Sequence, residues 1–312
     1  MPRFYCSDIE AATGRIDPVF LHSPQYECEP LSDLLATRVI LKVETMNPIR
    51  SFKGRGADLL VQQANKPLLC ASAGNFGQAM AYATRKYKVP LTVVASVNAN
   101  AFKVDRMKAL GAEVILQGED FDAAKVFAHQ LAAERQLRFV EDSFDVETAI
   151  GAGTIGLELL HYPEPLDALL VPVGNGALIN GIGSVYKEKS PATKIIGVQA
   201  AGAPAMVESW KARKRIMHES ISTIADGIGV RIPVKEALDD LEGVMDETLL
   251  VSEESLLLSM KILYRTAGLI VEPSGAAGIA ALLEHGPFKS MKVGVILCGS
   301  NLTQEQLNTW LT

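Results

Sequence analysis

Lys53 is the residue whose setting most favours covalent chemistry. A β-rich run at residues 38–46 ends at the turn-forming pair Asn47-Pro48, and Ser51 then begins an apolar stretch with helical periodicity. Proline disfavours helix at the preceding residue and serine is a good N-cap, so Lys53 is predicted in the first turn of a helix. The positive end of a helix opposes an ammonium group but tolerates a neutral amine, the form that makes a Schiff base with a carbonyl. On local grounds alone, a solvated lysine at a helix start remains the alternative.

A short glycine turn after an apolar strand offers a site for a carboxylate. It consists of Ser72, Ala73, Gly74 and Asn75 and leads into a helical pattern. Small residues let a ligand approach the backbone, and free N–H groups at a helix start suit a carboxylate or a phosphate. Ser72 and Asn75 add side-chain hydrogen bonds to this substrate-binding candidate. An ordinary helix cap explains the same residues equally well.

A second glycine turn is the strongest candidate for binding a phosphate. Between another apolar strand and another helical pattern lie Gly174, Asn175, Gly176, Ala177 and Leu178. The dinucleotide pattern GxGxxG would need glycine at position 179, which is Ile179, and the next strand ends without an acidic residue to hold a ribose. A single phosphate therefore fits this turn better than a dinucleotide.

Cys298 follows the last apolar strand of the chain, in the run Cys298-Gly299-Ser300-Asn301. It could be a core thiol, a nucleophile or a polar contact to a ligand. No histidine neighbours it in sequence, and buried cysteines are commonly inert, so we do not expect nucleophilic catalysis. Together, an imine-forming lysine, a phosphate turn, a carboxylate turn and this late polar group are the parts that hold pyridoxal phosphate and an amino acid.

The elements that must position these residues alternate between apolar strands and longer helices. Such alternation predicts an α/β fold with two packed domains, each with a twisted, mainly parallel sheet flanked by helices. We expect a discontinuous large cofactor-binding domain at residues 1–60 and 146–312, and a small mobile substrate-binding domain at 61–145. Strands are predicted at residues 68–71, 91–96, 113–116, 138–140, 169–173, 194–199 and 293–297. Helices are predicted at residues 75–88, 101–110, 122–135, 149–160, 176–187, 253–266, 275–284 and 303–311.

Composition excludes several classes of partner. The 312 residues carry 30 Lys+Arg against 36 Asp+Glu, a formal net charge of -6, which disfavours nucleic-acid binding. No run is long and apolar enough for a membrane span, and the N-terminus lacks the apolar run of a signal peptide. The four cysteines are scattered without CxxC spacing, so we expect reduced thiols in a cytoplasmic protein.

Across nearly its whole length the chain resembles the fold-type II pyridoxal-phosphate enzymes, whose fold is that of the tryptophan synthase β-subunit. Within that group it is most similar to the threonine/serine dehydratase (ammonia-lyase) family of amino-acid metabolism. The motifs that carry the resemblance are 51-SFKGRGA-57, 72-SAGN-75, 151-GAGTIGLE-158, 225-ADG-227, 272-EPSGA-276 and 298-CGSN-301. The resemblance implies a homodimer that converts a β-hydroxy amino acid to a 2-oxo acid and ammonia.

The resemblance also implies a role for each candidate residue. Lys53 would carry the cofactor as a Schiff base and then act as the Cα base, while Phe52 packs beside the cofactor ring. Asn75 would hydrogen-bond the cofactor hydroxyl, and residues 174–178 would bind its phosphate. Cys298 would lie near the pyridine nitrogen, where many relatives have serine. Because a thiol cannot keep that nitrogen protonated, elimination of a β-leaving group is favoured over a long-lived carbanion.

Several positions depart from the family pattern. Ala73 stands where racemases carry a serine that acts as the acid opposite the lysine, which argues against racemisation. Phe76 replaces a histidine common in dehydratases, and Arg50 replaces a small residue, so a larger or acidic β-hydroxy amino acid is an alternative substrate, with Arg50 as a candidate contact. Residues 200–206 carry no carboxylate, so no divalent metal is expected there. The chain ends at Thr312, after its last predicted helix, so we expect no C-terminal regulatory domain.

Other functions remain open. A β-replacement or a threonine-synthase-like reaction would use the same lysine and the same phosphate turn. A non-catalytic protein that binds the cofactor or an amino acid is the alternative from a different class.

Overall fold

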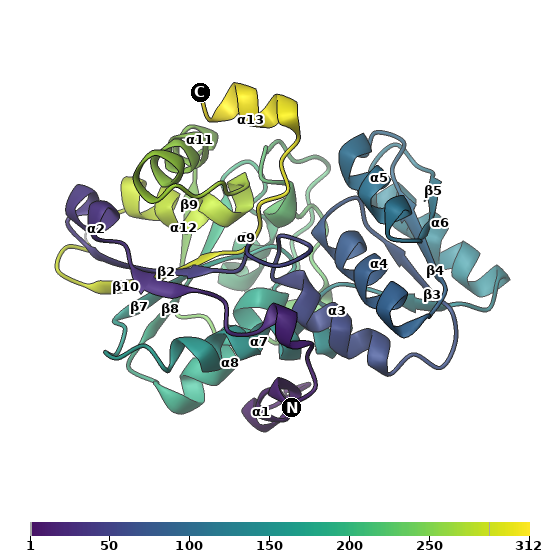
Figure 1. Cartoon of the computed structure of the whole chain (residues 1–312), viewed down its shortest axis with the longest axis horizontal. Helices are drawn as coiled ribbons and strands as arrows, with labels where there is room; N and C mark the ends of the chain where they lie inside the picture. The colour runs from purple at the N-terminus through teal and green to yellow at the C-terminus, as the bar shows by residue number, and fades with distance from the viewer. Residues whose placement is uncertain (1, 287) are drawn as a thin grey trace.

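The computed structural model describes residues 2–286 and 288–312 and shows an α/β protein built on two sheets (Figure 1). The larger sheet has six strands in the order β1-β2-β10-β7-β8-β9, with every neighbouring pair parallel except β1 and β2. Its strands are β1 (Gln25–Glu27), β2 (Arg38–Val43), β7 (Ala168–Pro172), β8 (Lys194–Ala200), β9 (Glu247–Val251) and β10 (Lys292–Leu297). The predicted class, with mainly parallel sheets flanked by helices, is confirmed.

The smaller sheet has four strands in the order β5-β4-β3-β6, all parallel. Its strands are β3 (Leu68–Ala71), β4 (Leu91–Ala95), β5 (Glu113–Leu116) and β6 (Arg138–Val140). All of them come from one stretch of sequence, whereas the larger sheet takes strands from both sides of it. The domain limits at 61 and 145 and the mobility of the smaller domain stay predictions.

Helices cover both faces of each sheet. On the larger sheet α11 and α12 contribute to one core and α7 and α8 to the other, while α4 and α5 face α6 across the smaller sheet. The helices are α1 (Cys6–Thr13), α2 (Glu29–Leu35), α3 (Lys53–Gln62), α4 (Asn75–Tyr87), α5 (Ala101–Ala109), α6 (Phe121–Glu134), α7 (Val146–Leu159), α8 (Ala177–Lys189), α9 (Ala205–Ala212), α10 (Lys235–Asp239), α11 (Glu253–Ile262), α12 (Pro273–Glu284) and α13 (Gln304–Trp310). Short 3-10 turns, η1 (Pro18–Phe20) and η2 (Asp226–Ile228), and a π-helical turn, η3 (Leu263–Ala267), complete the elements.

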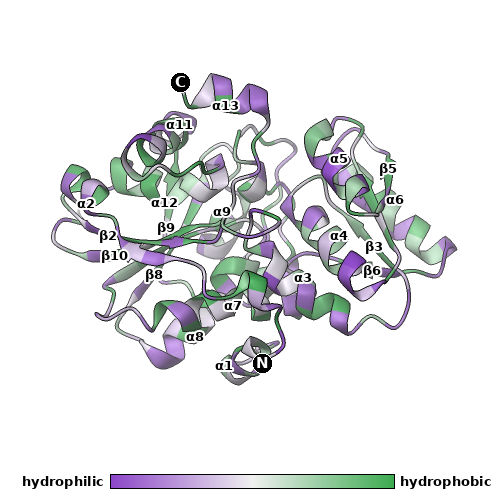
Figure 2. Ribbon diagram, viewed as in Figure 1, coloured by the Kyte–Doolittle hydropathy of each residue, from purple (hydrophilic) through white to green (hydrophobic). Residues whose placement is uncertain are grey.

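The apolar strands form these layers because each strand is buried on both faces. In β2, Val39 and Leu41 belong to the core under α11 and α12, whereas Ile40 belongs to the core under α7 and α8. This alternation is the period-2 pattern of a strand with two covered faces. The helices differ in hydropathy according to their burial (Figure 2): α12, which is mostly buried, is hydrophobic along much of its length, and α13 at the surface is largely hydrophilic. Within the described residues, no helix has the length and apolar character needed to cross a bilayer.

The helix that carries Lys53 begins two residues later than the predicted cap. Ser51 forms an antiparallel bridge with Gly299, and the Phe52 N–H donates to the Cys298 carbonyl at 3.1 Å. These bonds tie residues 51 and 52 to the segment after β10, so α3 starts at Lys53 with Phe52 at the cap position. Ser51 still accepts a long hydrogen bond of 3.4 Å from the Lys53 N–H. The prediction of Ser51 as N-cap is therefore wrong, although Lys53 does lie in the first helical turn.

A buried charge network fixes α3 against β2 and α7. The Arg55 guanidinium, fully buried, donates to Glu44 Oε1 at 2.8 Å and to Glu158 Oε1 at 2.6 Å. Lys42 Nζ lies 2.5 Å from Glu158 Oε2. Two cations and two carboxylates balance within one cluster, as buried charges require. The cluster holds the first turns of α3 in place, directly after Lys53.

Candidate active site

A cavity of about 370 Å³ lies at the carboxyl ends of strands from both sheets. Ligands in open parallel sheets bind at this edge, because loops after the strands converge there. The sequence-predicted residues that line the cavity are Phe52, Lys53, Ser72, Ala73, Gly74, Asn75, Asn175 and Cys298. Gly174, Gly176, Ala177 and Leu178 belong to the same turn as Asn175 but are not among the lining residues. One cavity thus collects side chains from four separate predicted motifs.

Lys53 projects into the cavity from the start of α3 and is paired there with a carboxylate. Its Nζ lies 2.5 Å from Asp142 Oδ2 and 4.5 Å from the centre of the Phe52 ring. Asp142 follows β6, next to Glu141, whose carboxylate pairs with Lys125. A carboxylate at this distance stabilises an ammonium group. The preference of the helix end for a neutral amine stays a prediction, and the structure adds a partner for Lys53 that lies 89 residues away in sequence.

Ser72 shapes the turn between β3 and α4. Its Oγ accepts hydrogen bonds from the N–H groups of Gly74 at 3.2 Å and Gly77 at 2.9 Å. The hydroxyl therefore serves as the local cap of this turn, as the alternative interpretation of the sequence allowed. Ala73 lies between these groups and presents only a methyl group to the cavity.

Asn75 is held at both ends of its amide. Nδ2 donates to Glu272 Oε1 at 2.6 Å, and Oδ1 accepts from Asn301 Nδ2 at 2.8 Å. Glu272 is almost fully buried, and its burial raises the pKa of the carboxyl group, against the lowering effect of Lys103. Lys103 itself forms an ion pair with Asp226 across the cleft. Glu272, Lys103 and Asp226 all line the cavity but were not singled out as site residues.

The turn before α8 has the backbone geometry of an anion cradle. Gly176 adopts φ +101°, a left-handed conformation that glycine accepts readily. The Ala177 N–H donates to Ser143 Oγ at 3.2 Å, and Asn175 Oδ1 accepts from the Val234 N–H at 3.1 Å. Among the described residues, no partner is found for the N–H groups of Gly174, Gly176 and Leu178. Donors left in this way at a helix start suit a phosphate.

Cys298 and Ser274 also line the cavity and add two buried polar groups to it. The Cys298 thiol is buried, and burial raises its pKa, so the group is a neutral thiol rather than a nucleophilic thiolate. The nearby Ser274 hydroxyl also lines the cavity and is buried without a hydrogen-bond partner among the described residues. A buried polar atom without a partner points to a ligand group. These donors, the cradle N–H groups and the Lys53 amine fit pyridoxal phosphate.

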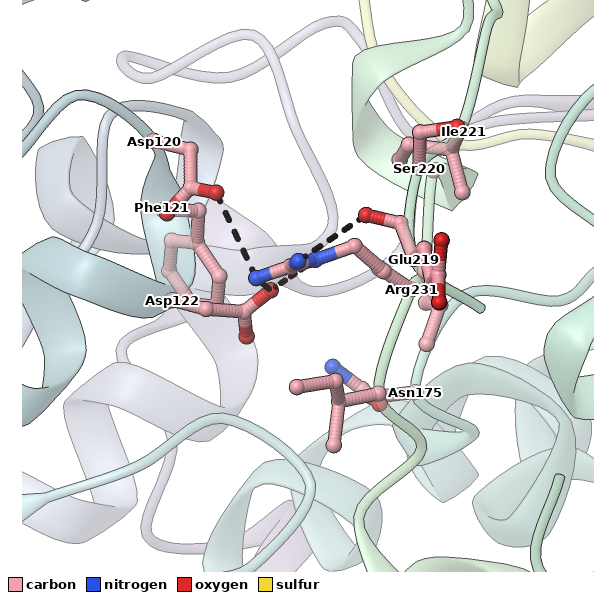
Figure 3. A pocket seen from close by; sticks show the side chains of 11 residues that line it. Asp120, Phe121, Asp122, Asn175, Glu219, Ser220, Ile221 and Arg231 are labelled. Carbon is pink, nitrogen blue, oxygen red and sulfur yellow. Dashed lines mark hydrogen bonds and ion pairs between the residues drawn. The ribbon is translucent and has the colours of Figure 1, made fainter. Parts of the chain in front are cut away.

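A smaller cavity of about 270 Å³ adjoins the larger one (Figure 3), and the two share the lining residues Phe121, Asn175, Ile221, Gly229 and Val230. Arg231 crosses it, with its guanidinium 2.6 Å from Asp122 Oδ2 and 3.3 Å from Asp120 Oδ2. The same side chain donates to the Glu219 carbonyl at 3.1 Å. The arginine comes from the segment after η2 and the two aspartates from the start of α6, so this contact joins the two walls.

Two expectations about neighbouring residues have different outcomes. Phe76 is buried and lines the cavity. Arg50 is exposed, has φ 53° and is not among the residues that line the cavity, so its role as a substrate contact stays a prediction. Within the described residues, no cluster of three or more His, Cys, Asp or Glu is placed to hold a metal ion. The expected lack of a metal at residues 200–206 stays a prediction.

Two mainly parallel sheets, with a lysine, a phosphate cradle and a carboxylate turn around one cavity at the ends of their strands, define an α/β enzyme that uses pyridoxal phosphate. The family described as pyridoxal-phosphate dependent enzymes matches residues 16–299, and the chain belongs to this family.

Known proteins with similar sequence or structure narrow the class. The catabolic L-threonine dehydratase of Staphylococcus aureus is 36% identical over 282 residues, covering 88% of this chain and 82% of the relative. A solved threonine deaminase isoform 2 from Solanum lycopersicum superposes with TM-score 0.89 and 31% identity, over 97% of this chain and 90% of the other. Serine racemase from maize gives TM-score 0.90 and 27% identity, over 97% and 95%.

Proposed function

We propose that the protein is a pyridoxal-phosphate-dependent ammonia-lyase acting on a β-hydroxy amino acid of the threonine or serine type. The reaction is α,β-elimination of water, and the final products are a 2-oxo acid and ammonia. One observation carries the proposal: the Lys53 amine and the Ser72–Asn75 turn line the same cavity, so a base faces a site for the substrate carboxylate. The 36% identity to a threonine dehydratase over most of the chain supports it.

The residues of the chain divide the work of the elimination. Lys53 would hold the cofactor through its side-chain nitrogen, and the same amine, once free, would remove the Cα proton of the substrate. When bound, the cofactor withdraws electron density from Cα and so weakens the Cα–H bond. The electron pair of that bond forms the Cα–Cβ double bond as the Cβ–O bond breaks, and the hydroxyl leaves as water, which overall carries away the proton that Lys53 removed from Cα. The released enamine reacts with water to give the 2-oxo acid and ammonia.

Other residues position the two ligands. Gly174, Asn175, Gly176, Ala177 and Leu178 offer the backbone cradle for the phosphate. Asn75, fixed by Glu272 and Asn301, would offer its second Nδ2 hydrogen to the ring hydroxyl, and Phe52 would pack beside the ring. Cys298, a neutral thiol, would lie by the pyridine nitrogen of the cofactor, where it would favour early loss of the β-hydroxyl over a persistent carbanion.

Racemisation is the second candidate, because the structural match to a serine racemase is as good as that to a threonine deaminase. Racemisation needs a proton donor on the face of Cα opposite the lysine. Ala73, in the turn that faces the substrate, has no proton to give. We therefore favour elimination.

A substrate panel tests the proposed function. The purified protein, loaded with pyridoxal phosphate, is incubated with L-threonine, L-serine and larger or acidic β-hydroxy amino acids, and ammonia and 2-oxo acids are measured. We expect both products from at least one of them, and none from a Lys53→Ala variant, which keeps its fold but loses the colour of the lysine-bound cofactor. Inertness across the panel, with turnover of O-acetylserine or O-phosphohomoserine, would identify a β-replacement or a threonine-synthase-like enzyme instead.

The setting of the enzyme also belongs to this proposal. We infer a cytoplasmic homodimer with a mobile smaller domain at residues 61–145, and no nucleic-acid partner. The scattered cysteines, all free and buried, support a reducing compartment. Sedimentation of the purified protein over a range of concentrations tests the dimer, and a monomer at micromolar concentration would contradict it.

A further inference from the structure

Asp142 is a carboxylate of the cavity that the elimination described above does not use. It follows β6, the edge strand of the smaller sheet, and its Oδ2 lies 2.5 Å from Lys53 Nζ. Its other oxygen, Oδ1, is buried and has no hydrogen-bond partner among the described residues. Asp142 and Lys53 thus both line the cavity, and Asp142 contacts the amine through one oxygen while its other oxygen stays without a partner among the described residues.

The remaining charged groups of the cavity are already matched with one another. Glu141 pairs with Lys125, and Lys103 pairs with Asp226. Glu272 accepts hydrogen bonds from the Asn75 side chain and from the Asn301 N–H. Lys53 and Asp142 are therefore each other's charged partner, and no neighbouring cation competes for Asp142 at salt-bridge distance among the described residues.

The proposed elimination makes Lys53 alternate between two charge states. The amine takes the Cα proton, so the Cα–H bond breaks, an N–H bond forms, and the amine becomes an ammonium ion. A carboxylate held 2.5 Å away can accept a hydrogen bond from this ammonium as it forms in a partly desolvated cavity.

We propose that Asp142 is a positioning residue of the elimination, which aims Lys53 Nζ and stabilises its protonated form after Cα–H cleavage. This inference rests on the proposed function. A hydrogen bond to a charged group contributes about 1.5–3 kcal/mol, which corresponds to about a 10- to 100-fold change in rate. The proton-transfer step should carry this loss when the carboxylate is removed, and substrate binding should not.

Activity measurements on the holoenzyme form the first arm of the test. Asp142→Asn should lower kcat about 10- to 100-fold and change KM by less than about threefold. The primary isotope effect on kcat with Cα-deuterated substrate should rise above that of the wild type, because Cα–H cleavage becomes limiting. A merely structural defect would lower the active fraction and leave the isotope effect unchanged, and that result would overturn the proposal.

Chemical labelling of the full chain, freed of cofactor with hydroxylamine, forms the second arm. Acetic anhydride attacks only the neutral amine, and peptide mass spectrometry reports acetylation of Lys53 at pH 7. Asp142→Asn should accelerate this acetylation about tenfold. Glu141→Gln, which alters the adjacent carboxylate paired with Lys125, should leave it at the wild-type rate. If Asp142→Asn does not fold, Asp142→Ser takes its place in both arms.

The two arms separate the possible failures. If Lys53 is acetylated in the Asp142 variant at the same rate as in the wild type, Asp142 does not control the reactivity of the amine. That result would overturn the inference, whatever the activity of the variant. A wild-type protein inactive on every β-hydroxy amino acid would overturn the proposed function, while the labelling would still report on the pair.

Discussion

Replacing Glu158 with glutamine removes one carboxylate from the buried network that holds α3. Glu158 accepts from Arg55 at 2.6 Å and from Lys42 at 2.5 Å, and its side chain is only 12% exposed. Burial by itself raises the pKa of Glu158, but the hydrogen bonds and charge of Arg55, helped by Lys42, outweigh it and lower the pKa to about 2. Glutamine has nearly the same shape and no charge, so Lys42 loses its carboxylate partner and Arg55 keeps only Glu44.

The direction of the pH dependence follows from the lowered pKa. A carboxyl group with a folded-state pKa of about 2 and a usual value of 4.5 stabilises the fold above pH 4.5, and this contribution is lost as pH falls toward 2. A shift of about 2.5 units corresponds to about 3 kcal/mol at pH 7, and to about 1.4 kcal/mol at pH 3. Glu158→Gln should therefore lower the free energy of unfolding by about 3 kcal/mol at pH 7 and by less than half of that at pH 3.

Urea denaturation of both proteins at pH 7, 5, 4 and 3 measures the difference in free energy of unfolding. Glu164→Gln is the matched control: Arg38 and Lys292 also lower the pKa of this carboxyl group to about 2, but on the surface. Water screens such a pair, so the control should lose much less stability than Glu158→Gln. A difference between wild type and Glu158→Gln that is the same at pH 7 and pH 3 would refute the electrostatic account and indicate a packing effect.

Three further changes test the packing and the site. Gly151→Ala should cost about 3 kcal/mol in urea denaturation, because its Cβ would lie 2.4 Å from the Gly56 nitrogen, whereas Gly14→Ala, with open space around it, should change little. Arg231→Gln should raise amide hydrogen exchange at residues 219–231 severalfold and lower the unfolding free energy by less than about 1 kcal/mol, since these cross-cleft pairs are partly exposed. Ala73→Ser should add D-serine formation from L-serine, measured by chiral chromatography, and its absence would place the missing acid elsewhere.

The central strands could be predicted from sequence because both of their faces are buried. Residues 68–71 and 91–95 are apolar throughout or nearly so, and they occur as β3 and β4 within a residue of the predicted ends. The edge strand β9 (Glu247–Val251) was not predicted, because it is half-exposed and its apolar run, residues 249–251, is short. The predicted helix at 253–266 occurs as α11 followed by the π-helical η3, whose wider turn has no signal in apolar spacing.

The residues of the site also differ in whether the sequence alone could identify them. The turns at Ser72 and Gly174 lie directly after strands, so local sequence was enough to find them. Asp142 follows a strand too, but its role depends on its contact with Lys53, which lies 89 residues away in sequence, and no local sequence pattern predicts that contact. Glu272 could have been selected from the sequence, since it belongs to the motif 272-EPSGA-276. Only the fold shows that it fixes Asn75, which lies 197 residues away in sequence.

The residues after Lys53 show why a short motif can specify a catalytic position. A Cβ on Gly54 would lie 2.2 Å from the Phe20 ring, and a Cβ on Gly56 would lie 2.6 Å from the Thr148 Cα atom in α7. Between them, Arg55 is fully buried in its charge network. Each of these three residues is thus committed to packing, which leaves Lys53 as the residue of this turn that faces the cavity. Because proton transfer from carbon needs the base placed to within a fraction of an ångström, rigid mounting of this turn is itself part of the catalytic apparatus.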